Sequence, residues 1–273
     1  MSFVIIQCGS SARGDANINS DIDLVCIWSE TPPNYDAISS EYDDVVFYSQ
    51  ETIRRMKEKG SLFLTHLDVD GVFLAGNKNL LNEFKDFRPL KSQITKQHNE
   101  TRRLIARLQW YPDSIIGQLW LCDVIYVALR TCVYCKNALS GHYAFGYLDA
   151  LAKFGLSEEN IRTMLIIRQG KYLYRKNRTT ASCTSELSCF DGKLVELACR
   201  AITECTVRFV AGGSTKWEKI KRNDYWSERL IERAILNGEY HDDEFMKKMT
   251  RHNYHKVSLK TDASKILESQ KKY

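Results

Sequence analysis

The sequence predicts an α+β protein, in which a small mixed β-sheet with flanking helices is followed by an all-helical bundle. Short apolar, β-rich runs bounded by turn residues fill the first part of the chain. From residue 79 the apolar positions recur with a helical period, and no internal repeat is visible. Because strands precede helices instead of alternating with them, we expect two domains, over 1–90 and 91–251, and a polar, mobile tail over 252–273.

Three apolar runs in the first domain are typical of strands. They cover residues 3–8 (FVIIQC), 22–28 (IDLVCIW) and 44–48 (DVVFY). Ser49 is a good N-cap for a helix over 50–58 that stops at Gly60. Residues 62–74 favour a short helix or strand, a turn at Asp70-Gly71 and a last strand ending near Gly76.

The second domain is predicted to be entirely helical, with breaks at glycine, proline and polar stretches. We expect helices over 79–87, 93–110, 115–138, 145–154, 158–176, 191–210, 224–237 and 242–250.

The charge of the chain is unevenly distributed. Residues 1–90 hold 8 Lys and Arg against 14 Asp and Glu, whereas the rest carries a net positive charge within a total of +5. An acidic first part suits a cation, and a basic second part suits a polyanionic ligand; faces that simply differ in charge are the plainer alternative. The first residues lack the basic leader of a signal peptide, so we expect a cytoplasmic protein without membrane contact.

The nine cysteines, an odd number, favour reduced thiols over a disulfide framework. Cys132 and Cys135 form a CxxC inside a helical pattern, without a second pair at zinc-like spacing. We therefore interpret these two as buried structural thiols.

The segment GSSARGDANINSDIDL, residues 9–24, carries the chemistry. Asp21 and Asp23 are two apart on a strand, so their carboxylates should share a face and repel each other unless a cation lies between them. Hard divalent ions such as Mg²⁺ take carboxylate and phosphate oxygens. Upstream, Gly9 lets the backbone approach a phosphate closely, and the Ser10 hydroxyl can donate to it.

This segment resembles the signature of the DNA polymerase β nucleotidyltransferase superfamily. The intervening Arg13-Gly14-Asp15 and Ser20 are similar to the minimal and kanamycin-type members, and KEKGSLFLTHLDVDGVFL resembles a stretch of bacterial members. The resemblance covers residues 3–90. It implies that Asp21 and Asp23 are metal ligands and that Gly9, Ser10, Arg13 and Ser20 bind the nucleoside triphosphate.

The resemblance also implies the reaction. An acceptor hydroxyl attacks the α-phosphorus in line and pyrophosphate leaves, with two Mg²⁺ ions, replaceable by Mn²⁺, holding the attacking and leaving oxygens. ATP is the expected nucleotide, and the acceptor is a small molecule, a protein side chain or an RNA 3′ end.

Many active members of the superfamily have a third carboxylate on a neighbouring strand. Asp44 is the best candidate for this catalytic metal ligand because it opens the third strand. Asp43 competes, since a one-residue shift in register would exchange their faces. Asp68 and Asp70 follow, and the site can also lack a working third carboxylate.

In the helical half, Arg168, Lys171 and Arg175 fall on one helical face. In kanamycin-type relatives a helical domain closes over the nucleotide, so the resemblance implies that Lys171 or Arg168 reaches the β- or γ-phosphate. An ordinary solvated basic face is the simpler alternative. We interpret the aromatic residues as helix-packing core and the isolated histidines as surface or core residues; these are Trp110, Trp120, Tyr126, Tyr134, His66, His98 and His142.

The sequence thus predicts an enzyme that moves a nucleoside monophosphate to a hydroxyl. An alternative from another class is a nucleotide-binding regulator of weak activity that pairs with a partner protein in a toxin–antitoxin or phage-defence module. A cyclic-dinucleotide synthase is disfavoured by the short spacing between Gly9 and Asp21. The oligomeric state is not encoded in any pattern that we recognise.

Overall fold

The computed structural model divides the chain into two compact units, each described by itself below. Unit 1 is built mainly from Met1–His98 and Val133–Gly155, and unit 2 mainly from Asn99–Cys132, Leu156–Arg251 and Val257–Tyr273. The structure describes residues 2–16, 23–42, 45–177, 192–220, 225–250 and 256–270.

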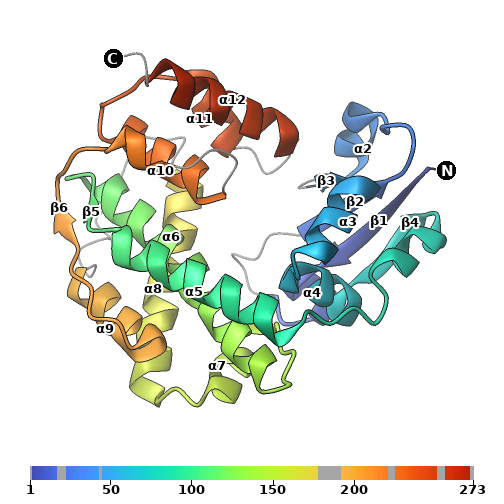
Figure 1. Ribbon diagram of the computed structural model, residues 1–273, viewed down its shortest axis with the longest axis horizontal. Helices are drawn as coiled ribbons and strands as arrows, with labels where there is room; N and C mark the ends of the chain where they lie inside the picture. The colour runs from blue at the N-terminus through green and yellow to red at the C-terminus, as the bar shows by residue number, and fades with distance from the viewer. Residues whose placement is uncertain are drawn as a thin grey trace. The chain divides into compact units, whose positions relative to one another are not determined.

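Unit 1 contains a four-stranded mixed sheet (Figure 1). The strands are β1 (Phe3–Cys8), β2 (Asp23–Trp28), β3 (Val45–Ser49) and β4 (Val72–Gly76). Their order in the sheet is β3-β2-β1-β4, with β1 antiparallel to both neighbours and β2 parallel to β3. The predicted strands and the α+β class are therefore confirmed.

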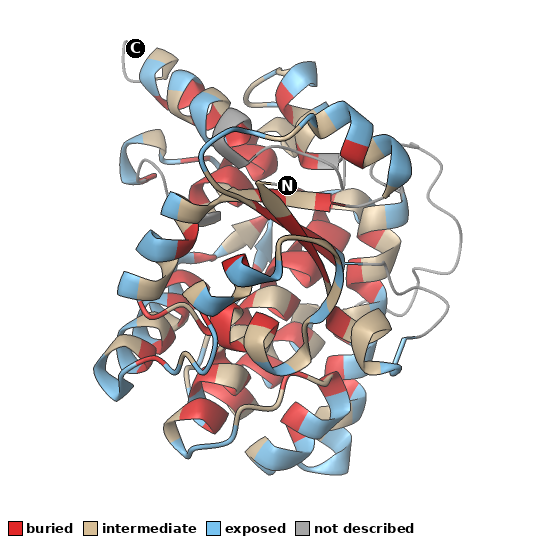
Figure 2. Ribbon diagram, turned by 90° about the vertical axis from the view of Figure 1, so that its right-hand side faces the viewer, coloured by how far each residue is buried: buried red, intermediate tan, exposed pale blue. Residues whose placement is uncertain are grey.

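Both faces of this sheet are covered, which explains the nearly continuous apolar runs of its inner strands. One face carries Val4, Ile6 and Val25 and packs against α3 (Gln50–Glu58), α4 (Leu62–Asp70) and the 3₁₀ turn η1 (Lys78–Glu83). The other face carries Ile5, Leu24 and Cys26 and packs against Ile38 of α2 (Tyr35–Glu41). Figure 2 shows these strands as buried ribbon. Burying each aliphatic side chain fully contributes about 1.5–3 kcal/mol to the free energy of folding.

The start of α3 follows the predicted capping chemistry. The Ser49 hydroxyl accepts a hydrogen bond from the Thr52 amide at 3.1 Å, and its oxygen lies 2.9 Å from the Thr52 hydroxyl oxygen. These bonds satisfy one of the free amides of the first turn. Ser49 therefore fixes where β3 ends and α3 begins.

The second segment of unit 1, Val133–Gly155, packs against residues of the first segment. Leu62 and Ile94 form a buried cluster with Cys135 and Ala138, which lie near the end of helix α6 (Ile115–Leu139). Cys132 and Cys135 are both buried, reduced thiols, in agreement with the structural interpretation of the CxxC.

Helices dominate the rest of the chain, as predicted. They are α5 (Lys91–Arg107), α6 (Ile115–Leu139), α7 (Tyr147–Phe154), α8 (Glu158–Asn177), α9 (Gly192–Thr203), η3 (Trp217–Lys219), α10 (Tyr225–Leu236), α11 (Asp243–Thr250) and α12 (Lys256–Ser269).

Helix α6 is long and apolar enough to cross a membrane by length and composition. However, 67% of its most apolar window is buried within the protein. Trp120, Cys122 and Leu129 are among its residues with no exposed surface. That burial is typical of the central helix of a packed bundle, which reads as apolar on every side.

The helices expected over 79–87 and 93–110 are shorter at their ends, since η1 is a 3₁₀ helix that ends at Glu83 and α5 ends at Arg107. Two further elements differ from the prediction. The helix expected over 191–210 ends at Thr203, where Glu204 adopts a left-handed backbone with φ 60°, and the chain continues to strand β6 (Val210–Ala211). This strand pairs in parallel with β5 (Trp110–Tyr111), a pairing that two-residue runs do not reveal in the sequence.

The mobile tail expected after residue 251 is the second correction, because α12 lies within it. Leu259, Ala263, Ile266 and Leu267 are buried, and their spacing places them on one helical face. The lysines between these positions conceal the periodicity in the sequence.

A buried ionic network links three helices of unit 2. Asp123 of α6 accepts from Arg175 of α8 at 3.1 Å and from Arg229 of α10 at 2.7 Å. Glu232 is fully buried; it pairs with Arg229 at 3.1 Å and accepts from Trp120 and Tyr174, at 3.2 and 2.5 Å. Charges buried at this depth are tolerated because each has an opposite charge or donor in contact.

Candidate active site

The predicted phosphate-binding turn directly follows the first strand of unit 1. Strand β1 ends at Cys8, and the short helix α1 (Gly9–Arg13) begins at the next residue. Gly9 has a positive φ of 76°, a conformation that side-chain-bearing residues rarely adopt. The sequence therefore places glycine where the backbone must reverse sharply.

Asp23 lies beside this turn, at the start of the neighbouring strand β2. Cys8 and Asp23 are register partners on β1 and β2, so the carboxylate of Asp23 lies beside the start of α1. A Cβ atom added at Gly9 would collide with that carboxylate and would lie 3.3 Å from its Cγ. The absence of a side chain at residue 9 thus makes room for Asp23.

The Asp23 carboxylate is exposed, and among the described residues it has no ion-pair or hydrogen-bond partner. Val25 and Ile27, two and four residues on, point from the same face into the core. The strand therefore supports an acidic group at its solvent end without neutralising it. Such a carboxylate is a suitable oxygen ligand for a hard cation.

The neighbouring thiol does not compete for this chemistry. Burial, and then the negative charge of Asp23, raise the pKa of Cys8 to about 12. Its Sγ donates weakly to the Asp23 carbonyl oxygen at 3.5 Å. Cys8 is therefore a protonated core residue at neutral pH.

Four of the predicted site residues lie outside the described part of the chain: Ser20, Asp21, Asp43 and Asp44. The shared face of Asp21 and Asp23 and the choice between Asp43 and Asp44 consequently stay predictions. Among the described residues, no group of three or more His, Cys, Asp or Glu side chains could hold a metal ion. Asp23 fits one ligand position of a Mg²⁺ site, and the remaining ligands stay predictions.

The two other candidate carboxylates are already engaged. Asp68 accepts from the Asp86 amide at 3.0 Å and from Arg88 at 2.6 Å. Asp70 accepts from Arg13 Nη1 at 2.9 Å and lies 3.3 Å from His66 Nε2. Both carboxylates therefore support the fold of α4 and the chain that follows it.

The cluster of Arg13, His66 and Asp70 was not anticipated as a unit. Arg13 was predicted as a nucleotide ligand, and His66 as an isolated surface or core histidine. Burial alone would raise the pKa of Asp70, but the hydrogen bonds with His66 and Arg13 outweigh it and lower that pKa. The i, i+4 spacing of His66 and Asp70 on α4 was the available signal, since these positions share a helical face.

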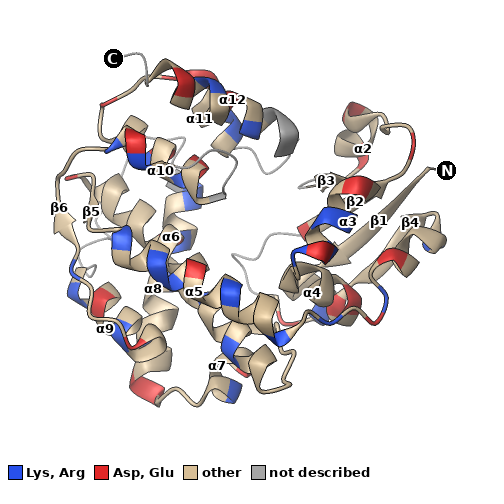
Figure 3. Ribbon diagram, in the orientation of Figure 1, with Lys and Arg blue, Asp and Glu red and all other residues tan. Residues whose placement is uncertain are grey.

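In unit 2, Lys171 has an unusual position for a lysine, since only 9% of its surface is exposed. Its Nζ lies 5.2 Å from the centre of the Tyr126 ring and 5.1 Å from that of Tyr172. Arg130 packs on the first ring and Arg168 on the second. Figure 3 marks the Lys and Arg positions along these helices. Cations that converge on two rings form a favourable environment for an anion.

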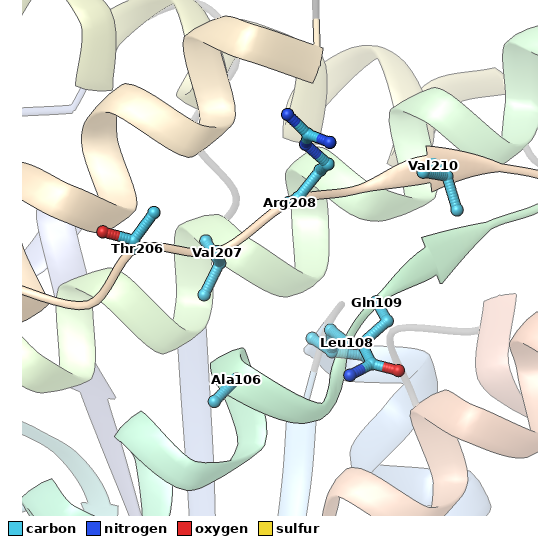
Figure 4. A pocket seen from close by; sticks show the side chains of 7 residues that line it. All are labelled: Ala106, Leu108, Gln109, Thr206, Val207, Arg208 and Val210. Atoms are coloured by element: carbon cyan, nitrogen blue, oxygen red, sulfur yellow. The ribbon is translucent and has the colours of Figure 1, made fainter.

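A shallow pocket of about 360 Å³ also lies in unit 2 (Figure 4). It is lined by Ala106, Leu108, Gln109, Thr206, Val207, Arg208 and Val210. In the figure, Arg208 points away from Gln109. This lining includes no carboxylate and none of the predicted site residues.

Comparison with known proteins agrees with the geometry of unit 1. Residues 4–98 match the family model of the nucleotidyltransferase domain. This part of the chain is therefore a nucleotidyltransferase domain, the catalytic module of transferases of phosphorus-containing groups, and a largely helical region follows it. No curated protein matches the chain.

Proposed function

We propose that this protein transfers a nucleoside monophosphate, AMP in the first instance, from a nucleoside triphosphate to a hydroxyl acceptor and releases pyrophosphate. The single observation that carries the proposal is the exposed carboxylate of Asp23, which has no ion-pair partner among the described residues and lies beside the backbone of Gly9 within a nucleotidyltransferase domain. General nucleotidyl transfer follows from the domain, whereas ATP, Mg²⁺ and the hydroxyl acceptor belong to the proposal.

In the proposed site the Gly9 backbone and the Ser10 hydroxyl contact the triphosphate. Asp23, with Asp21 and Asp44, would hold two Mg²⁺ ions, which neutralise charge on the phosphates and on the leaving pyrophosphate. The protein itself positions the α-phosphorus and the acceptor in line, which is the larger part of its task. Ser20 is a further proposed contact of the nucleotide.

Pyrophosphate release tests the proposed function. The purified protein is incubated in turn with ATP, CTP, GTP and UTP, with Mg²⁺ or Mn²⁺, and with an aminoglycoside, an RNA oligonucleotide or a protein as acceptor. We expect release with at least one combination and its loss in the Asp21→Ala plus Asp23→Ala variant. The melting temperature with and without ATP and Mg²⁺ distinguishes the enzyme from the alternative, because a nucleotide-binding regulator would be stabilised by the nucleotide but would show no turnover.

A further inference from the structure

Arg13 lies in the last turn of α1, four residues after Gly9, and its side chain contacts other residues of unit 1. Its Nη1 donates to Asp70 at 2.9 Å and lies 3.3 Å from His66 Nε2. Its Nη2 lies 3.3 Å from an oxygen of Asp15. The guanidinium group therefore uses both terminal nitrogens on side chains of the protein.

The pair of Arg13 and Asp70 is largely shielded from water. Their side chains are 19% and 11% exposed, so the interaction is screened less than a surface ion pair. Burial opposes the charge of Arg13, but the hydrogen bond and the charges of Asp70 and Asp15 outweigh it and raise the pKa of Arg13. Both groups thus stay charged and paired at neutral pH.

The same cluster reaches the second stretch of unit 1. The His66 ring packs on the Phe145 ring with centroids 4.7 Å apart. The next residue is Gly146, and a Cβ added there would lie 3.6 Å from Arg13 Nε and 3.5 Å from an Asp15 oxygen. Helix α1 is consequently bound to α4 through the pair of Arg13 and Asp70, and the start of α7 lies close to Arg13 and Asp15.

We propose that Arg13 is a positioning residue, whose pair with Asp70 and His66 holds α1 so that the Gly9–Ser10 turn keeps its place opposite Asp23. This inference rests on the proposed function for its kinetic consequences. It replaces the expectation that Arg13 binds the triphosphate, because its terminal nitrogens already serve Asp70 and Asp15. Asp70 and His66 become positioning residues of the same cluster.

Kinetics separate positioning from direct binding. Arg13→Ala and Asp70→Asn are each expected to lower kcat by about ten- to a hundredfold, with the KM for ATP changed by less than about twofold. The double variant should be little worse than either single one, since both remove one interaction. Arg13→Lys, which can still pair with Asp70, should restore part of kcat.

Arg54→Ala is the matched control. Arg54 also pairs with a carboxylate of unit 1, that of Glu83, but is 58% exposed and lies on α3. Its loss should leave both constants unchanged. A raised KM in Arg13→Ala together with an unchanged Asp70→Asn enzyme would instead assign Arg13 to the nucleotide and overturn the proposal.

A readout that needs no activity uses two buried thiols of the sheet. Cys8 adjoins α1, whereas Cys26 lies in the core on the opposite face. With iodoacetamide labelling followed by peptide mass spectrometry, Arg13→Ala and Asp70→Asn should raise the labelling rate of Cys8 about tenfold more than that of Cys26, which reports global unfolding. The Arg54→Ala control should label like the wild type.

The labelling outcomes are independent of turnover. A larger rise in labelling rate at Cys8 than at Cys26 supports positioning even if the wild type transfers no nucleotide, in which case only the proposed function fails. No change at Cys8, or an equal rise at Cys8 and Cys26, contradicts positioning, because the first shows that α1 is not held by the pair and the second shows general loosening.

Discussion

Gly9 has no side chain, and this absence makes space for the carboxylate of Asp23 on the neighbouring strand β2. Strand pairing brings Cys8 opposite Asp23, and Gly9, the next residue, combines a left-handed backbone with the absence of a Cβ beside that carboxylate. The Asp23 carboxylate is thereby exposed to solvent beside the backbone of Gly9. The proposed metal and triphosphate site depends on this arrangement.

Replacing Gly9 should therefore cost more than replacing another glycine of similar conformation. Gly9→Ala imposes about 1–2 kcal/mol for the left-handed backbone and roughly 1–3 kcal/mol more for the collision with Asp23. Gly14→Ala, with φ 79° and nothing within 4 Å of its added Cβ, carries the first cost alone. Urea denaturation of both variants measures the difference, and equal losses of stability would contradict the close packing of Asp23 on Gly9.

Asp70 should make stability depend on pH in a definite direction. Since its pKa is lowered in the folded state, its contribution is present above the unfolded value near 3.8 and is lost as pH falls through the folded value. We expect Asp70→Asn to destabilise by about 1–3 kcal/mol at pH 7, with a smaller difference from wild type below pH 3.8. Denaturation at several pH values tests this, with the exposed Asp36→Asn as control; a difference that grows in acid would contradict it.

Glu232 should be critical for the stability of unit 2. Glu232→Ala leaves the 6%-exposed Arg229 without one of its two carboxylate partners and removes the acceptor of Trp120 and Tyr174. Breaking such a buried pair typically costs about 3–5 kcal/mol. Thermal and urea unfolding measure the loss. The exposed Glu218→Ala should change little, and a similar small effect at Glu232 would show that the network contributes no net stability.

Local patterns carried most of the fold. The apolar runs predicted strands within one or two residues of β1, β2 and β3, and the Ser49 hydroxyl marked the start of α3, because caps and alternation depend on neighbouring residues. Helix α12 was missed because charged and polar residues separate the buried Leu259, Ala263 and Ile266. The β5–β6 pair joins residues a hundred positions apart, which no local pattern encodes.

For the candidate site too, local sequence motifs predicted some residues, whereas tertiary contacts could not be predicted. Gly9 and Asp23 were found because a motif of fixed spacing brings them together, and the structure places them in contact. Arg13 belonged to the same motif, yet its partners His66 and Asp70 come from α4, more than fifty residues later. A contact made by tertiary packing has no signature in a single sequence.

The most direct test of nucleotidyl transfer follows the label from ATP. With ATP labelled at the α-phosphate, label should enter the acceptor with one pyrophosphate released per transfer, whereas label at the γ-phosphate should stay in pyrophosphate. Asp23→Asn should slow the transfer by at least about a hundredfold, since one carboxylate of the proposed metal site is lost. Label passing from the γ-phosphate to the acceptor, or an Asp23→Asn protein as fast as the wild type, would contradict the account.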